Sequence, residues 1–246
     1  MLEVHVIDAL DNGDVAQARY HIECMLKFAE NSHDFYIAYG YFVMLERMNE
    51  NQEKVEEYSS LEVLYLERFL EENQTEQNPQ KIAEMYSDAG DVYRDVENYE
   101  KSALCYQKAI LETESVLGEK CAETMMLYQS LGVSLFLNHN INQGIKSYET
   151  ACEISERIFG IEHEDTIEML RELCTFYFMS WENTFNIEYL KKAKMCVEKI
   201  LPYLSADEAE LELENCLDYF YHAADICKEN QYEKQLQEIE LLISDF

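Results

Sequence analysis

The stretch that decides the fold reads Met85-Tyr86-Ser87-Asp88-Ala89-Gly90, because the chain repeats it twice at a constant spacing. It returns as Leu127-Tyr128-Gln129-Ser130-Leu131-Gly132 and as Met169-Leu170-Arg171-Glu172-Leu173-Cys174, each time 42 residues further on. A period of roughly 20 to 50 residues indicates stacked supersecondary units. The same offset relates four further sets: Tyr93, Leu135 and Tyr177; Tyr106, Tyr148 and Leu190; Ala109, Ala151 and Ala193; and Leu117-Gly118 and Phe159-Gly160.

Each unit has the spacing of two helices. Tyr86, Ala89, Gly90 and Tyr93 fall on one face of a first helix. Glycine within a helix costs roughly 0.5–1 kcal/mol relative to alanine, so we expect another helix to approach Gly90 closely. The pattern predicts antiparallel helix pairs that bury their apolar faces by stacking on their neighbours. The second helix is marked by Tyr99, Ser102, Ala103, Tyr106, Ala109 and Ile110.

These positions resemble the tetratricopeptide repeat (TPR), whose pattern of aromatic and small residues they follow from Tyr86 to Ala109. The 42-residue period is similar to the variant found in kinesin light chains, and residues 154–166 resemble the link between its repeats. The third unit departs from the pattern, with Cys174 at the glycine position and Asn186 at the first small position of the second helix. The resemblance implies an all-α, right-handed superhelical solenoid of antiparallel helix pairs that binds other proteins or peptides.

Composition places the whole chain in this class. Its 246 residues are 48% hydrophobic and include only 7 Gly and 2 Pro, which favours helix over the many turns of a β fold. No apolar run reaches the roughly 18 residues of a membrane helix, and the start lacks the pattern of a signal peptide. The eight cysteines form no C-x-x-C motif, so we expect reduced, buried thiols and a cytoplasmic protein.

The chain is strongly acidic, with 50 Asp and Glu against 19 Lys and Arg and a net charge of −31. This field repels nucleic-acid phosphates and anionic membrane surfaces, so we expect neither as a partner. The expected partner is a protein or peptide with basic and apolar residues. The basic cluster Lys191, Lys192, Lys194 and Lys199 is expected to be a solvated helix face.

The helical rhythm predicts about 11–12 helices in a single TPR-like domain over residues 1–246. Residues 1–78 form degenerate N-terminal helix pairs, 79–203 the best-matched repeats, and 204–246 C-terminal capping helices. Asp14 is expected to cap one helix, and Ser205 with Glu208 forms a capping box for another.

No catalytic motif is present: the chain lacks G-x-S-x-G, H-E-x-x-H, G-x-G-x-x-G and G-x-x-x-x-G-K-[ST]. The cluster His163-Glu164-Asp165 has possible metal ligands, but its place between two repeats favours a helix cap. We therefore expect no enzyme activity, no cofactor and no bound metal.

The first helix of each repeat is expected to line the concave face and to present the partner-binding residues. The positions where chaperone-binding repeats carry basic residues hold Asp91, Glu168 and Glu172 here, beside apolar side chains. The candidate residues are Glu84, Asp88, Asp91, Met126, Gln129, Val133, Phe136, Glu168, Arg171, Glu172, Thr175 and Met179.

Four functional hypotheses remain at this stage. The favoured one is a non-enzymatic interaction module or scaffold that binds a basic and apolar partner in the concave groove. The others are a bacterial peptide-sensing TPR regulator, a secretion-type chaperone and an acidic mimic of nucleic acid. A regulator would require an output segment that the sequence does not display, and a mimic would require rows of carboxylates on the convex face.

Overall fold

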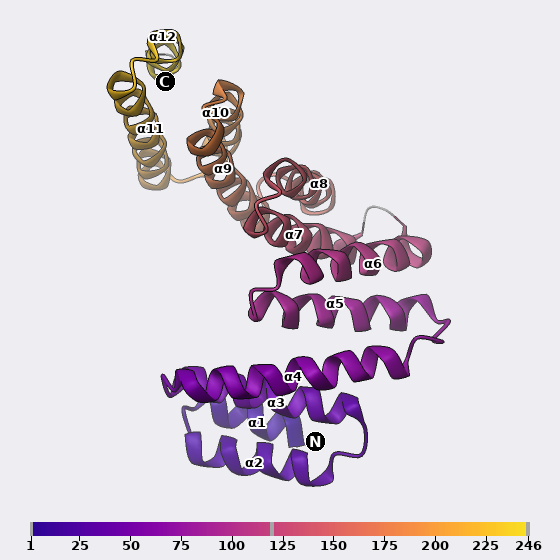
Figure 1. The fold of residues 1–246 in the computed structure, drawn as a ribbon. Coiled ribbons are helices and arrows are strands. Elements are labelled where there is room, and N and C mark those ends of the chain that lie inside the picture. The colour runs from indigo at the N-terminus through magenta and orange to yellow at the C-terminus, as the bar shows by residue number, and fades with distance from the viewer. Residues whose placement is uncertain (1, 119–120, 245–246) are drawn as a thin grey trace. The chain divides into compact units, whose positions relative to one another are not determined.

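The structure, a computed structural model, describes residues 2–118 and 121–244 (Figure 1). The regular elements of these residues are twelve α-helices and one short 3-10 helix, which confirms the prediction of an all-α fold of helix pairs. The chain divides into two compact units, Met1–Val116 and Leu117–Phe246. This division does not coincide with the predicted subdivisions at residues 78 and 203, and the single-domain organisation stays a prediction.

Unit 1 contains three successive helix pairs. The pairs are α1 (Leu2–Asp11) with α2 (Val15–Phe28), α3 (Ser32–Met48) with α4 (Gln52–Glu72), and α5 (Pro79–Asp95) with α6 (Tyr99–Leu117), whose last residue lies past the unit boundary. Asp14 caps α2 as predicted, since its side chain accepts a hydrogen bond from the backbone N–H of Gln17 at 3.0 Å.

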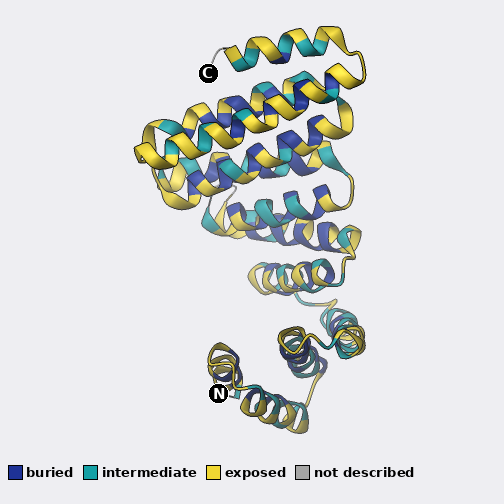
Figure 2. Cartoon of the chain, turned by 90° about the vertical axis from the view of Figure 1, so that its left-hand side faces the viewer, coloured by how far each residue is buried: buried dark blue, intermediate teal, exposed yellow. Residues whose placement is uncertain are grey.

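Unit 2 also contains three pairs. They are α7 (Ala122–Leu137) with α8 (Ile141–Phe159), α9 (Glu164–Thr184) with α10 (Ile187–Ile200), and α11 (Ala206–Glu229) with α12 (Glu233–Ser244); the 3-10 helix Leu201–Tyr203 follows α10. Buried residues lie where helices of one unit face each other, and exposed residues cover the outer sides (Figure 2). The predicted capping helices are thus a complete sixth pair.

The repeat is visible in how the helices of unit 2 begin. Cys121, His163 and Ser205 are the N-caps of α7, α9 and α11, and successive caps are 42 residues apart. In each case the side chain accepts a hydrogen bond from a backbone N–H of the first turn, which otherwise has no partner. The predicted roles of His163 as a cap and of Ser205 with Glu208 as a capping box are confirmed.

The close approach predicted at the glycines is confirmed. A Cβ at Gly90 would lie 2.7 Å from Cε1 of Tyr106, and one at Gly132 would lie 3.0 Å from the backbone oxygen of Gly144. Gly144 has the reciprocal relation, because a Cβ there would lie 2.9 Å from the oxygen of Gly132. Helices α7 and α8 therefore touch by their backbones.

Asn186 is not a packing residue of a second helix, as the repeat pattern had suggested. It is the N-cap of α10, where its Oδ1 accepts the backbone N–H of Glu188 at 3.1 Å. Relative to the 42-residue period, α9 continues about one turn further than α7, and α10 lacks the first turn of α8. The same positions of the second helix are nevertheless buried in both pairs. Leu190 and Ala193 are fully buried, as are Tyr148 and Ala151, which lie 42 residues earlier.

Carboxylates on the second helices tie neighbouring pairs together. Glu67 of α4 accepts hydrogen bonds from Tyr93 of α5 (3.2 Å) and Lys101 of α6 (2.6 Å). Glu149 of α8 does the same with Tyr177 of α9 (2.5 Å) and Lys192 of α10 (2.7 Å). Part of the negative charge of the chain thus serves the fold.

The predicted solvated lysine face is wrong for Lys194. Its side chain is buried, and its Nζ donates to the backbone oxygen of Leu242 in α12 at 3.1 Å. Lys192 and Lys199 are half-exposed, but both reach across to glutamates of α8. These lysines fasten α10 to its neighbours and do not form a free basic patch.

Candidate functional site

Two first helices of unit 2, α7 and α9, carry most of the predicted partner-binding residues. On α9, the exposed side chains Glu168, Glu172, Thr175 and Met179 follow one another at intervals of three or four residues. This spacing places them on one side of the helix. We call the surface formed by these four residues, Arg171, Met126 of α7 and Glu212 of α11 the first-helix face.

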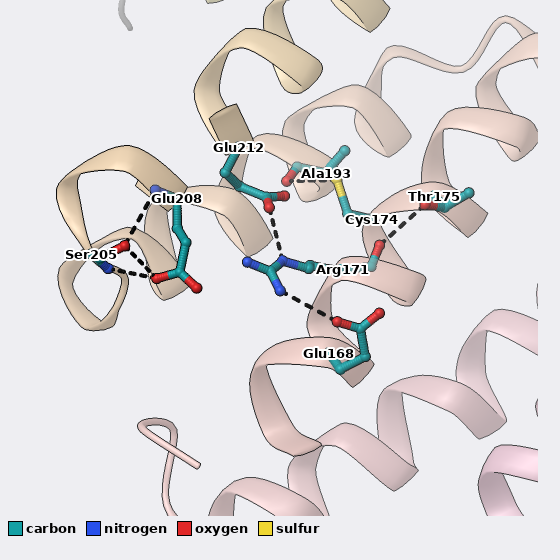
Figure 3. Close-up of polar contacts among 8 residues, drawn as sticks. All are labelled: Glu168, Arg171, Cys174, Thr175, Ala193, Ser205, Glu208 and Glu212. Atoms are coloured by element: carbon teal, nitrogen blue, oxygen red, sulfur yellow. Dashed lines mark hydrogen bonds and ion pairs between the residues drawn. The ribbon is translucent and has the colours of Figure 1, made fainter. Parts of the chain in front are cut away.

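Arg171 lies between two carboxylates on this face (Figure 3). Its Nε is 2.8 Å from Oε2 of Glu212 in α11, and its Nη1 is 3.3 Å from Oε2 of Glu168. Partial burial disfavours the charged guanidinium, but the hydrogen bonds and the attraction of Glu212 and Glu168 outweigh it and raise the pKa of Arg171. Arg171 therefore links α9 to α11.

Glu172 and Gln129 meet at the hydroxyl of Tyr148. The hydroxyl donates a hydrogen bond to Glu172, and Nε2 of Gln129 donates to the same hydroxyl oxygen at 3.2 Å. Burial, reinforced by the hydrogen bond to Glu172, raises the pKa of Tyr148. Two residues predicted to bind a partner thus also fix the junction of α7, α8 and α9.

The apolar part of the face consists chiefly of methionines. Met126 of α7 is 61% exposed and Met179 of α9 is 42% exposed, whereas Val133 is half-buried. Phe136 does not reach the surface, because it is only 8% exposed and its ring stacks on Phe176 at a centroid distance of 4.6 Å. Phe136 is therefore a core residue, and the prediction that it contacts a partner is wrong for this side chain.

Helix α11 extends the face, which sequence reasoning had missed. Besides Glu212, it contributes Tyr219, whose ring stacks on Phe178 of α9 at 4.3 Å. Near its start Glu208 accepts hydrogen bonds from Ser205, which lower the pKa of Glu208 (Figure 3). The signal was present in the sequence, because Cys216 lies 42 residues after Cys174 and Ser205 lies 42 after His163.

The three remaining candidates, Glu84, Asp88 and Asp91, lie on α5 in unit 1. Asp91 accepts hydrogen bonds from the hydroxyl of Tyr106 (2.7 Å) and from Arg94 (2.6 Å). Glu84 and Asp88 line a cleft of about 530 Å³ between α3, α4 and α5. These three residues lie in a different compact unit from the other candidates, and a single groove through all candidates stays a prediction.

Nothing in the described part of the chain resembles a metal centre: no three His, Cys, Asp or Glu side chains there are placed to hold an ion. Likewise, no helix among the described residues is long and apolar enough to cross a membrane. The first-helix face itself offers charge, hydrogen bonding and apolar contact.

No protein-family model matches the sequence, and no curated protein matches it significantly. Solved structures do match the fold. BtubC (BKLC) from P. vanneervenii aligns with a TM-score of 0.54 at 13% identity, covering 100% of this chain and 93% of that protein. TPR-like repeats of a kinesin light chain from Podosopora anserina also align with a TM-score of 0.54, at 12% identity, covering 79% and 92% respectively. In its fold, the chain is a TPR-like helical repeat protein.

Proposed function

We propose that this protein is a non-enzymatic scaffold whose first-helix face binds a protein or peptide segment that carries Lys or Arg beside apolar side chains. The observation that supports it is the arrangement on α9, where exposed Met179 follows the carboxylates Glu168 and Glu172 on one side of the helix. Methionine is flexible and accepts varied apolar partners. The carboxylates favour a positive charge next to the apolar side chain of the partner.

Glu168 is the carboxylate best suited to a partner's cation. Its side chain is 62% exposed, and only one of its oxygens contacts Arg171. Glu172 and Glu212 are each engaged by a side chain of this chain, namely Tyr148 and Arg171. A basic group of a partner can therefore bind the second carboxylate oxygen of Glu168 without displacing Arg171 from the first.

The large negative charge acts on the rate of association more than on final affinity. A net charge of −31 attracts a basic segment from a distance and repels acidic ones. Exposed charges are screened within about 8 Å at physiological ionic strength. We therefore expect added salt to lower the association rate constant and to change the dissociation rate constant little.

The test begins with a selection of peptides. Random peptides displayed on phage are selected with the full chain, and the enriched sequences are synthesised. The proposal expects Lys or Arg next to Leu, Met or Phe among them. Binding is then located with ¹³C-methyl-labelled methionines, and the signals of Met126 and Met179 should shift saturably.

Two double variants decide whether the face is responsible. Glu168→Gln with Glu172→Gln removes two charges but keeps an acceptor for Tyr148, so the fold is preserved and binding should weaken about tenfold. Glu153→Gln with Glu240→Gln removes two exposed charges from second helices of the same unit and should leave affinity within about twofold. Equal loss in both variants, or unmoved Met126 and Met179 signals, would show that the partner binds elsewhere.

A further inference from the structure

The cleft between α3, α4 and α5 in unit 1 is lined by aromatic rings and carboxylates, unlike the first-helix face with its methionines. Three aromatic rings cluster there: the centroid of His33 lies 5.1 Å from that of Tyr36 and 5.0 Å from that of Phe69, and Tyr36 and Phe69 are 5.5 Å apart. The lining also includes the carboxylates of Glu72, Glu84 and Asp88. Aromatic faces and carboxylates together attract organic cations.

The side chain of Asp88 makes no hydrogen bond or ion pair with another described residue. Asp91, about one turn further on, instead binds Tyr106 and Arg94. Although part of its side chain is open to solvent, partial burial raises the pKa of Asp88; Asp91 and Glu84 add to this effect, and His33 opposes it. A bound cation would relieve this unfavourable charge.

A second, independent feature is the hydroxyl of Tyr36. Tyr36 lines the cleft, although only 2% of the residue is exposed. Its hydroxyl oxygen is buried and has no hydrogen-bond partner in the described part of the chain. Leaving a buried hydroxyl unpaired is unfavourable, so such groups usually have a partner. Burial first, and then the negative charges of Asp88, Glu62 and Glu3, raise the pKa of Tyr36, with Asp88 the strongest of the three charges.

The cleft contains one lysine, which does not fill this role. Nζ of Lys81 lies 2.8 Å from Glu76, a residue outside the cleft lining. Glu72 accepts a hydrogen bond from Ser32 and so is partly satisfied. The cleft therefore has two groups without a partner among the described residues: the exposed carboxylate of Asp88 on α5 and the buried hydroxyl of Tyr36 on α3, beside the ring of Phe69.

We propose that this cleft binds the guanidinium group of an arginine side chain from a partner. The planar guanidinium stacks on aromatic rings, and its fork of N–H donors can reach a carboxylate and a second acceptor at once. A lysine ammonium is a compact point charge that stacks less well and offers no planar fork. The site lies in unit 1 and is independent of the first-helix face.

The experiment uses the full chain with ¹³C-methyl methionine and three pentapeptides, Gly-Gly-X-Gly-Gly, where X is arginine, lysine or citrulline. Met85 lines the cleft and is 5% exposed, so its methyl signal reports on this site, whereas Met126 and Met179 report on the first-helix face. The arginine peptide should shift Met85 saturably. The citrulline peptide, which has the same shape without the charge, should bind at least about tenfold more weakly.

Variants test the two unsatisfied groups. Asp88→Asn should weaken the arginine peptide about tenfold and Tyr36→Phe about threefold, while Glu100→Gln on α6, which also removes one exposed charge, should leave its affinity unchanged. Equal affinity for the lysine or citrulline peptide, or no Met85 shift at all, would overturn the assignment. Because the peptide comparison uses the unmodified protein, it remains decisive even if a variant fails to fold. Methylguanidinium alone, titrated in parallel, should have a lower affinity than the arginine peptide. Equal affinities would overturn the proposal that the ligand is the arginine side chain of a partner.

Discussion

The pairs α7/α8 and α9/α10 occupy equivalent places in consecutive repeats, yet they solve the same packing problem differently. In the first pair, Gly132 and Gly144 let the two backbones touch. In the second, Cys174 stands at the position of Gly132, and its thiol donates to the backbone oxygen of Ala193 at 3.6 Å. The second helix there begins about a turn later, at the cap Asn186.

The difference shows that equivalent positions of the repeat are filled in more than one way. In the α5/α6 pair, the position of Gly144 holds Ser102, whose hydroxyl donates to the backbone oxygen of Gly90 at 2.8 Å. In the α9/α10 pair the same position holds Asn186, which caps a second helix that begins one turn later. The third variant occurs in unit 1, where Gly40 of α3 faces neither backbone nor thiol but the carboxyl of Glu62: a Cβ there would lie 2.7 Å from Oε1.

The largest effect is expected at the backbone contact. Gly132→Leu forces a side chain against Gly144 and Tyr148, whose backbone atoms cannot rotate away, so we expect a loss of about 3 kcal/mol in the free energy of unfolding. Urea denaturation followed by circular dichroism measures it. Met126→Ala on the same helix removes an exposed side chain and should change stability by less than about 0.5 kcal/mol. Similar values for the two variants would refute the close approach.

The next effect concerns Glu62, the neighbour of Gly40. Burial first, and the charge of Asp95 second, raise the pKa of Glu62 from 4.5 to about 7, with Arg47 opposing. Because the folded pKa is raised, the folded state binds more protons than the unfolded chain between these values. The contribution of Glu62 to the free energy of unfolding therefore falls as the pH rises from about 4.5 to about 7.

Glu62→Gln should remove this pH dependence. We expect the variant to be more stable than the unmodified protein by about 2 kcal/mol at pH 8, with the difference shrinking towards pH 5. Melting temperatures at a series of pH values check it. Glu57→Gln, an exposed glutamate on the same helix, serves as the control. A stability difference that is independent of pH would mean that Glu62 titrates normally.

A smaller effect separates the two helix pairs directly. Cys174→Gly leaves a void and adds a flexible residue within α9, so we expect a loss of about 1–2 kcal/mol in the free energy of unfolding. We thus expect glycine to stabilise the protein at position 132 and to destabilise it at position 174. Cys174→Ala, measured beside Gly132→Ala, gives a matched comparison. Should Cys174→Gly stabilise the protein, the thiol would have no packing role.

The smallest perturbation is a thiol assay that leaves the sequence intact. Six of the eight cysteines are buried, and Cys24 and Cys121 are half-buried. Burial raises the pKa of Cys105 to about 11 and those of Cys196 and Cys216 to about 12, so little reactive thiolate exists at neutral pH. Alkylation of the native protein should be fast at no more than two sites and reach eight in denaturant. Rapid native labelling of most cysteines would contradict this packing.

The sequence by itself determined the helix pairs, their period and several caps. These follow from local rules: the spacing of Tyr86, Gly90 and Tyr93 on one helical face, and the preference of Asp14 and Ser205 for the start of a helix. The period also extends to Ser205 and Cys216, within the segment predicted to form C-terminal capping helices, and the structure has a sixth helix pair there. Local and periodic signals survive in the sequence because each repeat must solve the same packing problem.

The tertiary structure alone decided which side chains remain available at the surface. Sequence spacing put Phe136 and Met179 on the same kind of helix face, but stacking on Phe176 buries the first and leaves the second exposed. Likewise, only the arrangement of α9 and α11 brings Glu212 to Arg171, and only that of α3, α4 and α5 places Tyr36 and Asp88 in one cleft. These contacts join residues on different helices and depend on how the helices pack, which the spacing of residues within one helix does not specify.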